Sequence, residues 1–196
     1  MSKEDRISKQ KISKGEHGYI DRRKRQQLLR TIIMFSIAAA IYITGLALNK
    51  WENTNVFTIV AALWVLPSAK FLVNYIVLAP FKTVGEEQYE KVLPLVREGD
   101  TMYTDMVFTS TEKVMDLAFL IIRGNEAVGL IGREKEDASY MEQYLKDALK
   151  KRAFAVRVTI EKKEDVFLRH IKRDATESLP EGELKRLQEF LQSLMV

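Results

Sequence analysis

Three acidic residues in the second half of this 196-residue sequence lie within or just after apolar segments, and their carboxylates could do chemistry. Asp116 lies inside an apolar segment, and Glu134 and Glu136 follow the next apolar segment, beginning 18 residues further along the chain. Carboxylate oxygens are the ligands that Mg²⁺ prefers, and bound metal ions can activate water for phosphodiester hydrolysis. Side chains of this type can bind a divalent cation when the fold brings them together.

An ordinary ion pair is the alternative explanation for Asp116. Gly124 and Asn125 separate the two apolar segments and have the composition of a two-residue hairpin turn. Such a turn would place Arg133 opposite Asp116 on the neighbouring strand, and opposite charges in that position stabilise each other. Under this interpretation Asp116 needs no metal ion.

The composition excludes several other kinds of chemistry. The chain has no cysteine, which rules out disulfides, thiol nucleophiles, zinc–cysteine sites and iron–sulfur clusters. Its two histidines, His17 and His170, lie in separate regions, so a histidine metal site is not expected. Gly124 and Gly129 have the spacing of the first half of a phosphate-binding loop, but Leu130 stands in place of the lysine. We expect no resident cofactor or metal.

The 115 residues of the segment 82–196 are mixed in polarity and numerous enough for one compact domain. Their hydrophobic patterns predict an α+β domain with the element order αβββαβα. The expected elements are a helix over 86–98, strands over 102–110, 114–122 and 127–132, a helix from Ser139 with a capping box to Glu142, an edge strand over 155–161, a short helix or loop over 165–173, and a final helix opening at 178–181.

This order of elements is similar to the core of the restriction-endonuclease-like superfamily. The resemblance implies a metal-dependent nuclease with an Asp on the second core strand and Glu-x-Lys or Glu-x-Glu on the third. Asp116 and the run Glu134-Lys135-Glu136 match those motifs, so the resemblance implies Asp116, Glu134 and Glu136 as the catalytic set, although both glutamates follow the third strand instead of lying within it. The likeness covers roughly residues 86–161 in topology only, and it implies either an active nuclease or a degenerate, non-catalytic relative.

Two apolar segments precede this domain and together form residues 31–81. Thr31–Asn49 contains 19 uncharged residues, which as a helix span roughly 28 Å, close to the thickness of the bilayer hydrocarbon. Val56–Pro80 is as apolar and carries one charge, Lys70. Only six residues separate the two segments, so we expect an antiparallel transmembrane hairpin. A cleaved signal peptide would have a shorter apolar core than the first segment.

Basic residues near the ends of the spans predict their orientation. Positive residues collect on the cytoplasmic side of membrane proteins. Six precede the first span (Lys14, Arg22, Arg23, Lys24, Arg25 and Arg30), three follow the second (Lys82, Lys91 and Arg97), and Lys50 alone lies between. Both termini are therefore expected in the cytoplasm of a bacterial-type cell, with the chain a multi-pass protein of the inner membrane.

Residues 1–30 hold 10 basic and 4 acidic side chains and have no sustained apolar period. Such a segment buries too little surface to offset the entropy of ordering, so a disordered basic cytoplasmic arm is expected. Its proximal cluster is expected to contact the anionic headgroups of the bilayer, or simply to fix the topology. The cluster consists of Arg22, Arg23, Lys24, Arg25 and Arg30.

Lys70 and Asn74 are the notable polar residues of the second span. A lysine within a membrane costs at least ~2.5 kcal/mol, so it either extends to the headgroups, pairs with Asn74 one turn away, or serves an ion pathway or a membrane partner. On the first span Ser36, Ala40 and Thr44 form a stripe of small residues that would let another helix approach.

Together these features predict a membrane-tethered cytoplasmic interaction or scaffold module without an identifiable catalytic site. The bilayer and its anionic headgroups, and either a protein partner or a second copy of the chain, are the expected partners. Nucleic acid is not expected, because the surplus positive charge lies in the arm while residues 82–196 hold 19 basic and 22 acidic side chains. A membrane-anchored metal-dependent nuclease and an accessory subunit of a larger membrane complex remain alternatives.

Overall fold

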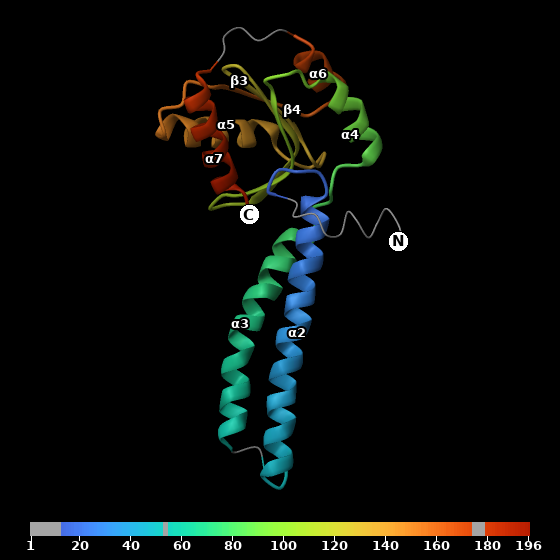
Figure 1. The fold of residues 1–196 in the computed structure, drawn as a ribbon, viewed down its shortest axis with the longest axis vertical. Helices are drawn as coiled ribbons and strands as arrows, with labels where there is room; N and C mark the ends of the chain where they lie inside the picture. The colour runs from blue at the N-terminus through green and yellow to red at the C-terminus, as the bar shows by residue number, and fades with distance from the viewer. Residues whose placement is uncertain (1–12, 53–54, 174–178) are drawn as a thin grey trace. The chain divides into compact units, whose positions relative to one another are not determined.

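The computed structural model describes residues 13–52, 55–173 and 179–196. The chain divides into two compact units, which are a sheet domain formed by residues 13–20 and Phe81–Val196 and a helical hairpin formed by Asp21–Pro80 (Figure 1). The hairpin is thus an insertion between two segments of the sheet domain. This organisation differs from the expected division, in which the domain begins at residue 82.

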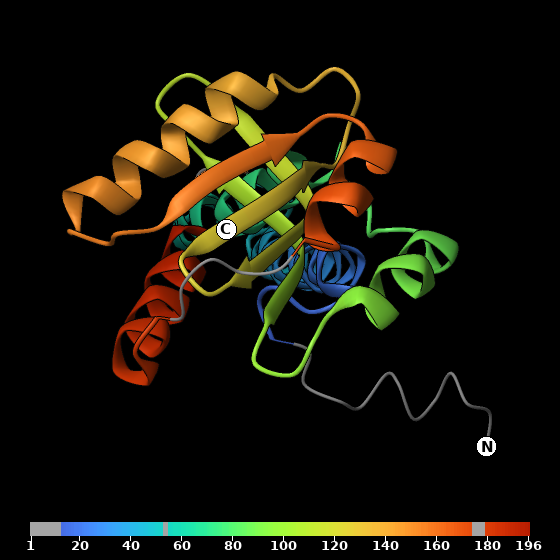
Figure 2. The same cartoon turned by 90° about the horizontal axis from the view of Figure 1, so that it is seen from above.

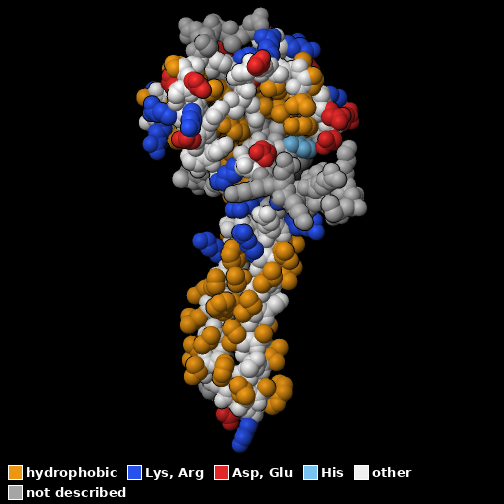
Figure 3. Space-filling view, viewed as in Figure 1, with side chains coloured by type: hydrophobic (Ala, Val, Ile, Leu, Met, Phe, Trp, Pro, Cys, Tyr) orange, Lys and Arg blue, Asp and Glu red, His pale blue; other side chains and the backbone are white. Residues whose placement is uncertain are grey.

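The hairpin consists of α2 (Tyr19–Leu48) and α3 (Val56–Leu78). Both helices are long and apolar enough to cross a membrane, with mean hydropathies of 2.1 and 2.0. Only 17% and 11% of the residues in their apolar windows are buried, whereas a core helix of a soluble protein would be mostly buried. Apolar side chains accordingly cover the visible surface of both helices (Figure 3).

Small residues bring the two helices together within the hairpin. Ala38 and Gly45 of α2 are buried and lie seven residues apart, as do Ala61 and Ser68 of α3. A Cβ atom added at Gly45 would lie 2.3 Å from the Cβ of Phe57, so the backbone approaches that side chain too closely for any larger residue. A seven-residue repeat of small side chains is typical of closely packed membrane helices.

The structure differs from the predicted disordered arm over residues 13–30. Helix α2 begins at Tyr19, so the last twelve residues of the arm are helical, and residues 13–18 form turns within the sheet domain. The reason is that Arg, Lys and Gln favour helix, and extending an existing helix costs far less than starting one. Residues 1–12 lie outside the described part of the chain.

The sheet domain contains a four-stranded sheet in the order β1-β2-β3-β4. Strands β1 (Thr101–Thr109), β2 (Val114–Arg123) and β3 (Glu126–Ile131) are antiparallel neighbours, and β4 (Arg157–Glu161) lies parallel to β3 at the edge. The helices are α4 (Glu86–Val92) with a 3₁₀ turn over Leu93–Leu95, α5 (Ala138–Lys151), α6 (Glu164–Ile171) and α7 (Glu181–Leu194). The α+β prediction is confirmed, and α6 settles the segment predicted as helix or loop.

Helices cover both faces of this sheet (Figure 2). On one face α5 and α7 bury Leu145 and Leu187 against β1, β2 and β4. On the other face Val92 of α4 and Phe167 of α6 pack against Phe119 of β2. The continuous apolar run of β2 therefore has the predicted cause, which is burial on both sides.

Two local details differ from the sequence prediction. The Gly124–Asn125 turn is present, with Arg123 paired to Glu126, but the register of β2 and β3 shifts by one residue between Leu117 and Phe119. The second difference concerns α5, whose N-cap is Asp137 instead of Ser139. The predicted capping box is therefore wrong.

Candidate functional site

The predicted residue Asp116 forms an ion-pair cluster with two residues that follow β3. The Nε atom of Arg133 lies 3.0 Å from Oδ1 of Asp116, and the same guanidinium contacts the carboxylate of Glu136. The side chains of Asp116 and Glu136 are only 5% and 10% exposed. Arg133 therefore bridges two carboxylates that the sequence placed in a metal site, as the ion-pair interpretation of Asp116 predicted.

The register shift in β2 explains why this pair forms although Arg133 does not lie directly opposite Asp116. The backbone N–H of Gly132 donates to the carbonyl of Asp116 over 3.2 Å, so Gly132 is the strand neighbour. A Cβ atom at Gly132 would lie 1.9 Å from Oδ2 of Asp116. Glycine at this position leaves the space that the carboxylate fills as it turns toward Arg133.

Burial dominates the electrostatics of Asp116. Desolvation raises the pKa of Asp116 above its usual value of 3.8, and the neighbouring carboxylate of Glu136 raises it further, while the hydrogen bond and the charge of Arg133 lower it. The Arg133 guanidinium also lies 4.3 Å from the centre of the Phe81 ring. The cation is thus held by two carboxylates and one aromatic face.

The third member of the predicted catalytic set lies apart from this cluster. Glu134 is exposed in the turn between β3 and α5, where Lys135 is exposed as well. Among the described residues there is no group of three or more His, Cys, Asp or Glu side chains that could hold a metal ion. The structure brings Asp116 and Glu136 together through Arg133, whose guanidinium pairs with both carboxylates.

The predicted membrane-surface residues lie on the first turns of α2. Arg22 to Arg25 are consecutive, so at 100° per residue their side chains point around the whole circumference of the helix. Lys24 pairs with Asp21 at 2.8 Å, and the Arg30 guanidinium lies 6.0 Å from the centre of the Phe71 ring of α3. The cluster is therefore a basic collar around one end of the hairpin.

The polar residues predicted to lie within the membrane are on α3, which remains helical through Pro67. Lys70 is exposed and Asn74 is half-buried, one helical turn apart. The buried polar residue of this helix is instead Ser68, whose hydroxyl donates to the carbonyl of Trp64 over 3.1 Å. A hydroxyl that bonds its own helix is easily accommodated among apolar side chains.

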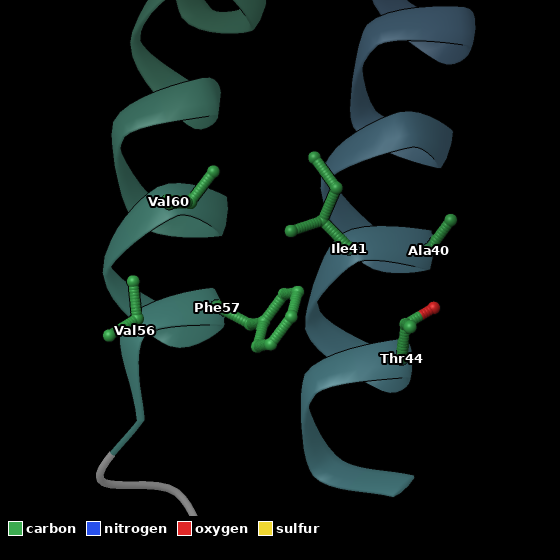
Figure 4. A pocket seen from close by; sticks show the side chains of 6 residues that line it. All are labelled: Ala40, Ile41, Thr44, Val56, Phe57 and Val60. Carbon is green, nitrogen blue, oxygen red and sulfur yellow. The ribbon is translucent and has the colours of Figure 1, made fainter. Parts of the chain in front are cut away.

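The predicted stripe of small residues does not join the two helices. Ser36, Ala40 and Thr44 are exposed on the outer surface of the hairpin. Ala40 and Thr44 border an apolar hollow of about 410 Å³, whose other walls are Ile41, Val56, Phe57 and Val60. Figure 4 shows the Phe57 ring pointing from α3 toward Ile41 of α2.

A second buried carboxylate, which the sequence prediction missed, lies on β1. Asp105 is 1% exposed, and its two oxygens accept hydrogen bonds from the backbone N–H groups of Gly18 and Val84, both over 2.9 Å. His17 completes the arrangement, because its Nε2 lies 2.8 Å from the carbonyl of Val84 and its ring packs against Tyr89. These contacts join three distant segments of the sheet domain.

The backbone around Asp105 is shaped for this role. Its φ of 54° lies in the left-handed region, which Asp tolerates better than most residues, and the β1–β2 pairing skips this position. The preceding Thr104 donates its N–H to the carbonyl of Gly15 over 2.8 Å. Burial raises the pKa of Asp105 above 3.8, although the bonds from Val84, Thr83 and Gly18 lower it. A charged residue inside a strand of apolar neighbours was the available sequence signal.

Arg123 is a further buried ionic residue, at the end of β2. Its guanidinium pairs with Asp100 and donates to the carbonyls of Leu95, Ile171 and Arg173. Its side chain is 10% exposed, and the last two carbonyls lie at the C-terminal end of α6, where a positive charge is favourable. These contacts are structural, since every one of them ties a turn or a helix end to the sheet.

No protein-family model, curated protein or solved structure matches this chain. Two features of the sheet domain bear on function: the Asp116–Arg133–Glu136 cluster, in which opposite charges are already paired, and the Asp105 anchor, which binds the segments before and after the hairpin.

Proposed function

We propose that this chain is a membrane-tethered interaction module. In this proposal α2 and α3 cross a bacterial-type inner membrane, the sheet domain lies in the cytoplasm, and the domain binds another protein. The apolar exterior of both helices and the basic collar before the first span support the membrane placement. The anionic headgroups of the inner leaflet would contact that collar.

The observation that carries the proposal is the double anchor at Asp105. Gly18 immediately precedes α2, and Val84 follows the end of α3 by six residues. Because one buried carboxylate binds both, the sheet domain holds the two chain connections to the hairpin by short, hydrogen-bonded segments. A sheet domain that fixes both chain connections to two apolar helices is suited to presenting a protein surface at the membrane.

The ion pairs of the Asp116 cluster favour binding over catalysis. Asp116 and Glu136 both pair with Arg133, whose positive charge opposes the binding of a metal cation between them. The nuclease alternative predicts cleavage of DNA or RNA by the purified full chain with Mg²⁺ or Mn²⁺. We expect no cleavage, and cleavage that disappears in Asp116→Ala would overturn the proposal.

The membrane topology can be tested directly because the chain contains no cysteine. Single cysteines are introduced at Glu52, between the two helices, and at Glu87, an exposed residue of α4. A maleimide that does not cross membranes should label position 52 in intact cells and position 87 only after permeabilisation. Labelling of position 87 from outside would overturn the cytoplasmic placement.

A further inference from the structure

A groove between α5 and α7 is a concave surface of the sheet domain. Its volume is about 530 Å³, and residues 109–111, at the end of β1 and in the turn after it, also line it. Tyr140 and Tyr144 of α5 and Phe190 of α7 form its aromatic walls. The Tyr140 hydroxyl lies 3.1 Å from the hydroxyl of Ser110, and this contact holds the Tyr140 ring beside the turn that follows β1.

Positive charges accompany the aromatic rings along this groove. The Nζ atom of Lys113 lies 3.9 Å from the centre of the Tyr140 ring, and the Arg152 guanidinium lies 5.4 Å from the centre of the Phe190 ring. The Phe190 ring also stacks on the ring of Phe154. A cation over an aromatic face is attracted by the ring and stays available to an anion on its other side.

The charge of the groove is opposite to that of the domain around it. Lys151 and Arg152 line the groove together with one acidic side chain, Asp147, so the groove lining has one more basic than acidic residue. Residues 82–196 as a whole carry three more acidic than basic side chains. The basic character is therefore a local property of this groove and not of the whole surface.

We propose that this groove binds an acidic amphipathic helix of a partner protein. The inference rests on the proposed interaction function and names the surface and the chemistry of the partner. Two helical walls with aromatic side chains between them can accept the apolar face of a third helix. Acidic residues beside that apolar face would lie against Lys151, Arg152 and Lys113, while a basic or neutral helix would leave those charges unpaired.

A photo-crosslinking experiment on the full chain in native membranes tests this proposal. p-Benzoylphenylalanine is placed at Thr111, an exposed residue at the rim of the groove, and separately at Arg169, an exposed residue of α6 on the opposite face of the sheet. Mass spectrometry then maps the crosslinked peptide. We expect a protein adduct at position 111 whose peptide has acidic and apolar residues at helical spacing.

Reversing the charge of the groove residues provides a second test of the same crosslinking reaction. The double variant Lys151→Glu, Arg152→Glu should lower the yield of the adduct about tenfold or more, and Lys151→Glu alone should lower it in the same direction without altering a ring contact. The matched control is Lys162→Glu, Lys163→Glu, which makes the same change in net charge at exposed positions before α6 and should leave the yield unchanged.

The outcomes separate the groove from the general function. A protein adduct at position 169 without one at position 111 overturns the groove and leaves the interaction function standing. Protein adducts at neither position overturn both. A lipid, a nucleic acid, a second copy of this chain or a peptide without acidic residues captured at position 111 overturns the proposed partner, as does an adduct that both double variants reduce equally.

Discussion

Asp105 accepts a hydrogen bond over 2.9 Å from the backbone N–H of Gly18, a residue 87 positions earlier in the chain. Its other oxygen binds Val84, so a single side chain closes a loop that contains the whole hairpin. The contact also ties residues 13–20 to β1. This relationship makes Asp105 the residue whose replacement has the clearest expected effect.

Asp105→Ala should lower the free energy of unfolding of the detergent-solubilised protein by about 3 kcal/mol. Two buried N–H groups lose their acceptor, and alanine is less stable than aspartate in the left-handed backbone conformation. Asp105→Asn should cost less, because asparagine tolerates that conformation and keeps one acceptor oxygen. Denaturant unfolding measures the difference, with exposed Glu112→Ala as the control. Equal stability of Asp105→Ala and the native chain would contradict the anchoring role.

The raised pKa of Asp105 predicts a pH dependence of stability. Because the folded state holds the proton more tightly than the unfolded chain, the contribution of Asp105 is fully present below pH 3.8 and is lost as the pH rises through the raised folded-state pKa. Asp105→Asn removes this titration. From pH 4 to pH 7 the native chain should therefore lose stability relative to Asp105→Asn. A constant difference between the two proteins across this range would mean that the pKa is not raised.

Gly132→Ala should destabilise the protein by about 2 kcal/mol or more, because the added methyl group would overlap the carboxylate of Asp116. In an Asp116→Ala background the same change should cost much less, since the overlap is gone. A double-mutant cycle measures this coupling. Gly182→Ala in α7 is the control, because nothing lies within 4 Å of the position of its Cβ. Additive effects at positions 116 and 132 would argue against the close contact.

Gly45→Val should weaken the packing of α2 on α3, because its side chain would overlap Phe57. The matched substitution Ala40→Val lies on the exposed surface of the same helix and should be tolerated. Resistance to unfolding by a denaturing detergent distinguishes the two. If both variants unfold at the same detergent fraction as the native chain, Gly45 does not limit the approach of the helices.

Much of the fold follows from periodic sequence patterns. The two apolar segments, the continuous run of β2 and the Gly124–Asn125 turn each predict their element because burial dictates residue type at those positions. The start of α2 was missed, since basic residues carry no apolar period even where they continue a helix. The start of α5 was missed because Glu142 is engaged by Lys146 and by the backbone N–H of Ile160 on β4, a contact between distant segments.

The candidate site was only partly predictable for the same reason. Opposite charges on neighbouring strands indicated the Asp116–Arg133 pair. The register shift and the pairing of Glu136 with Arg133 depend on packing that no local sequence pattern encodes. The partners of Asp105 are backbone groups of residues 18 and 84, and a backbone donor leaves no mark in a sequence. The signal was limited to one acidic residue in an apolar strand.

The interruption of the sheet domain by the hairpin orders the events of biogenesis. In the proposed membrane setting, the ribosome would deliver α2 and α3 to the bilayer before synthesising the strands against which residues 13–20 pack. On the cytoplasmic side, the N–H of Gly18 would have no Asp105 acceptor until β1 had been synthesised. Suppose that the hairpin were inserted in the opposite orientation and the strands that follow were not translocated with it. Gly18 and Val84 would then lie on the other side of the bilayer from β1, and Asp105 would lose both of its hydrogen-bond donors.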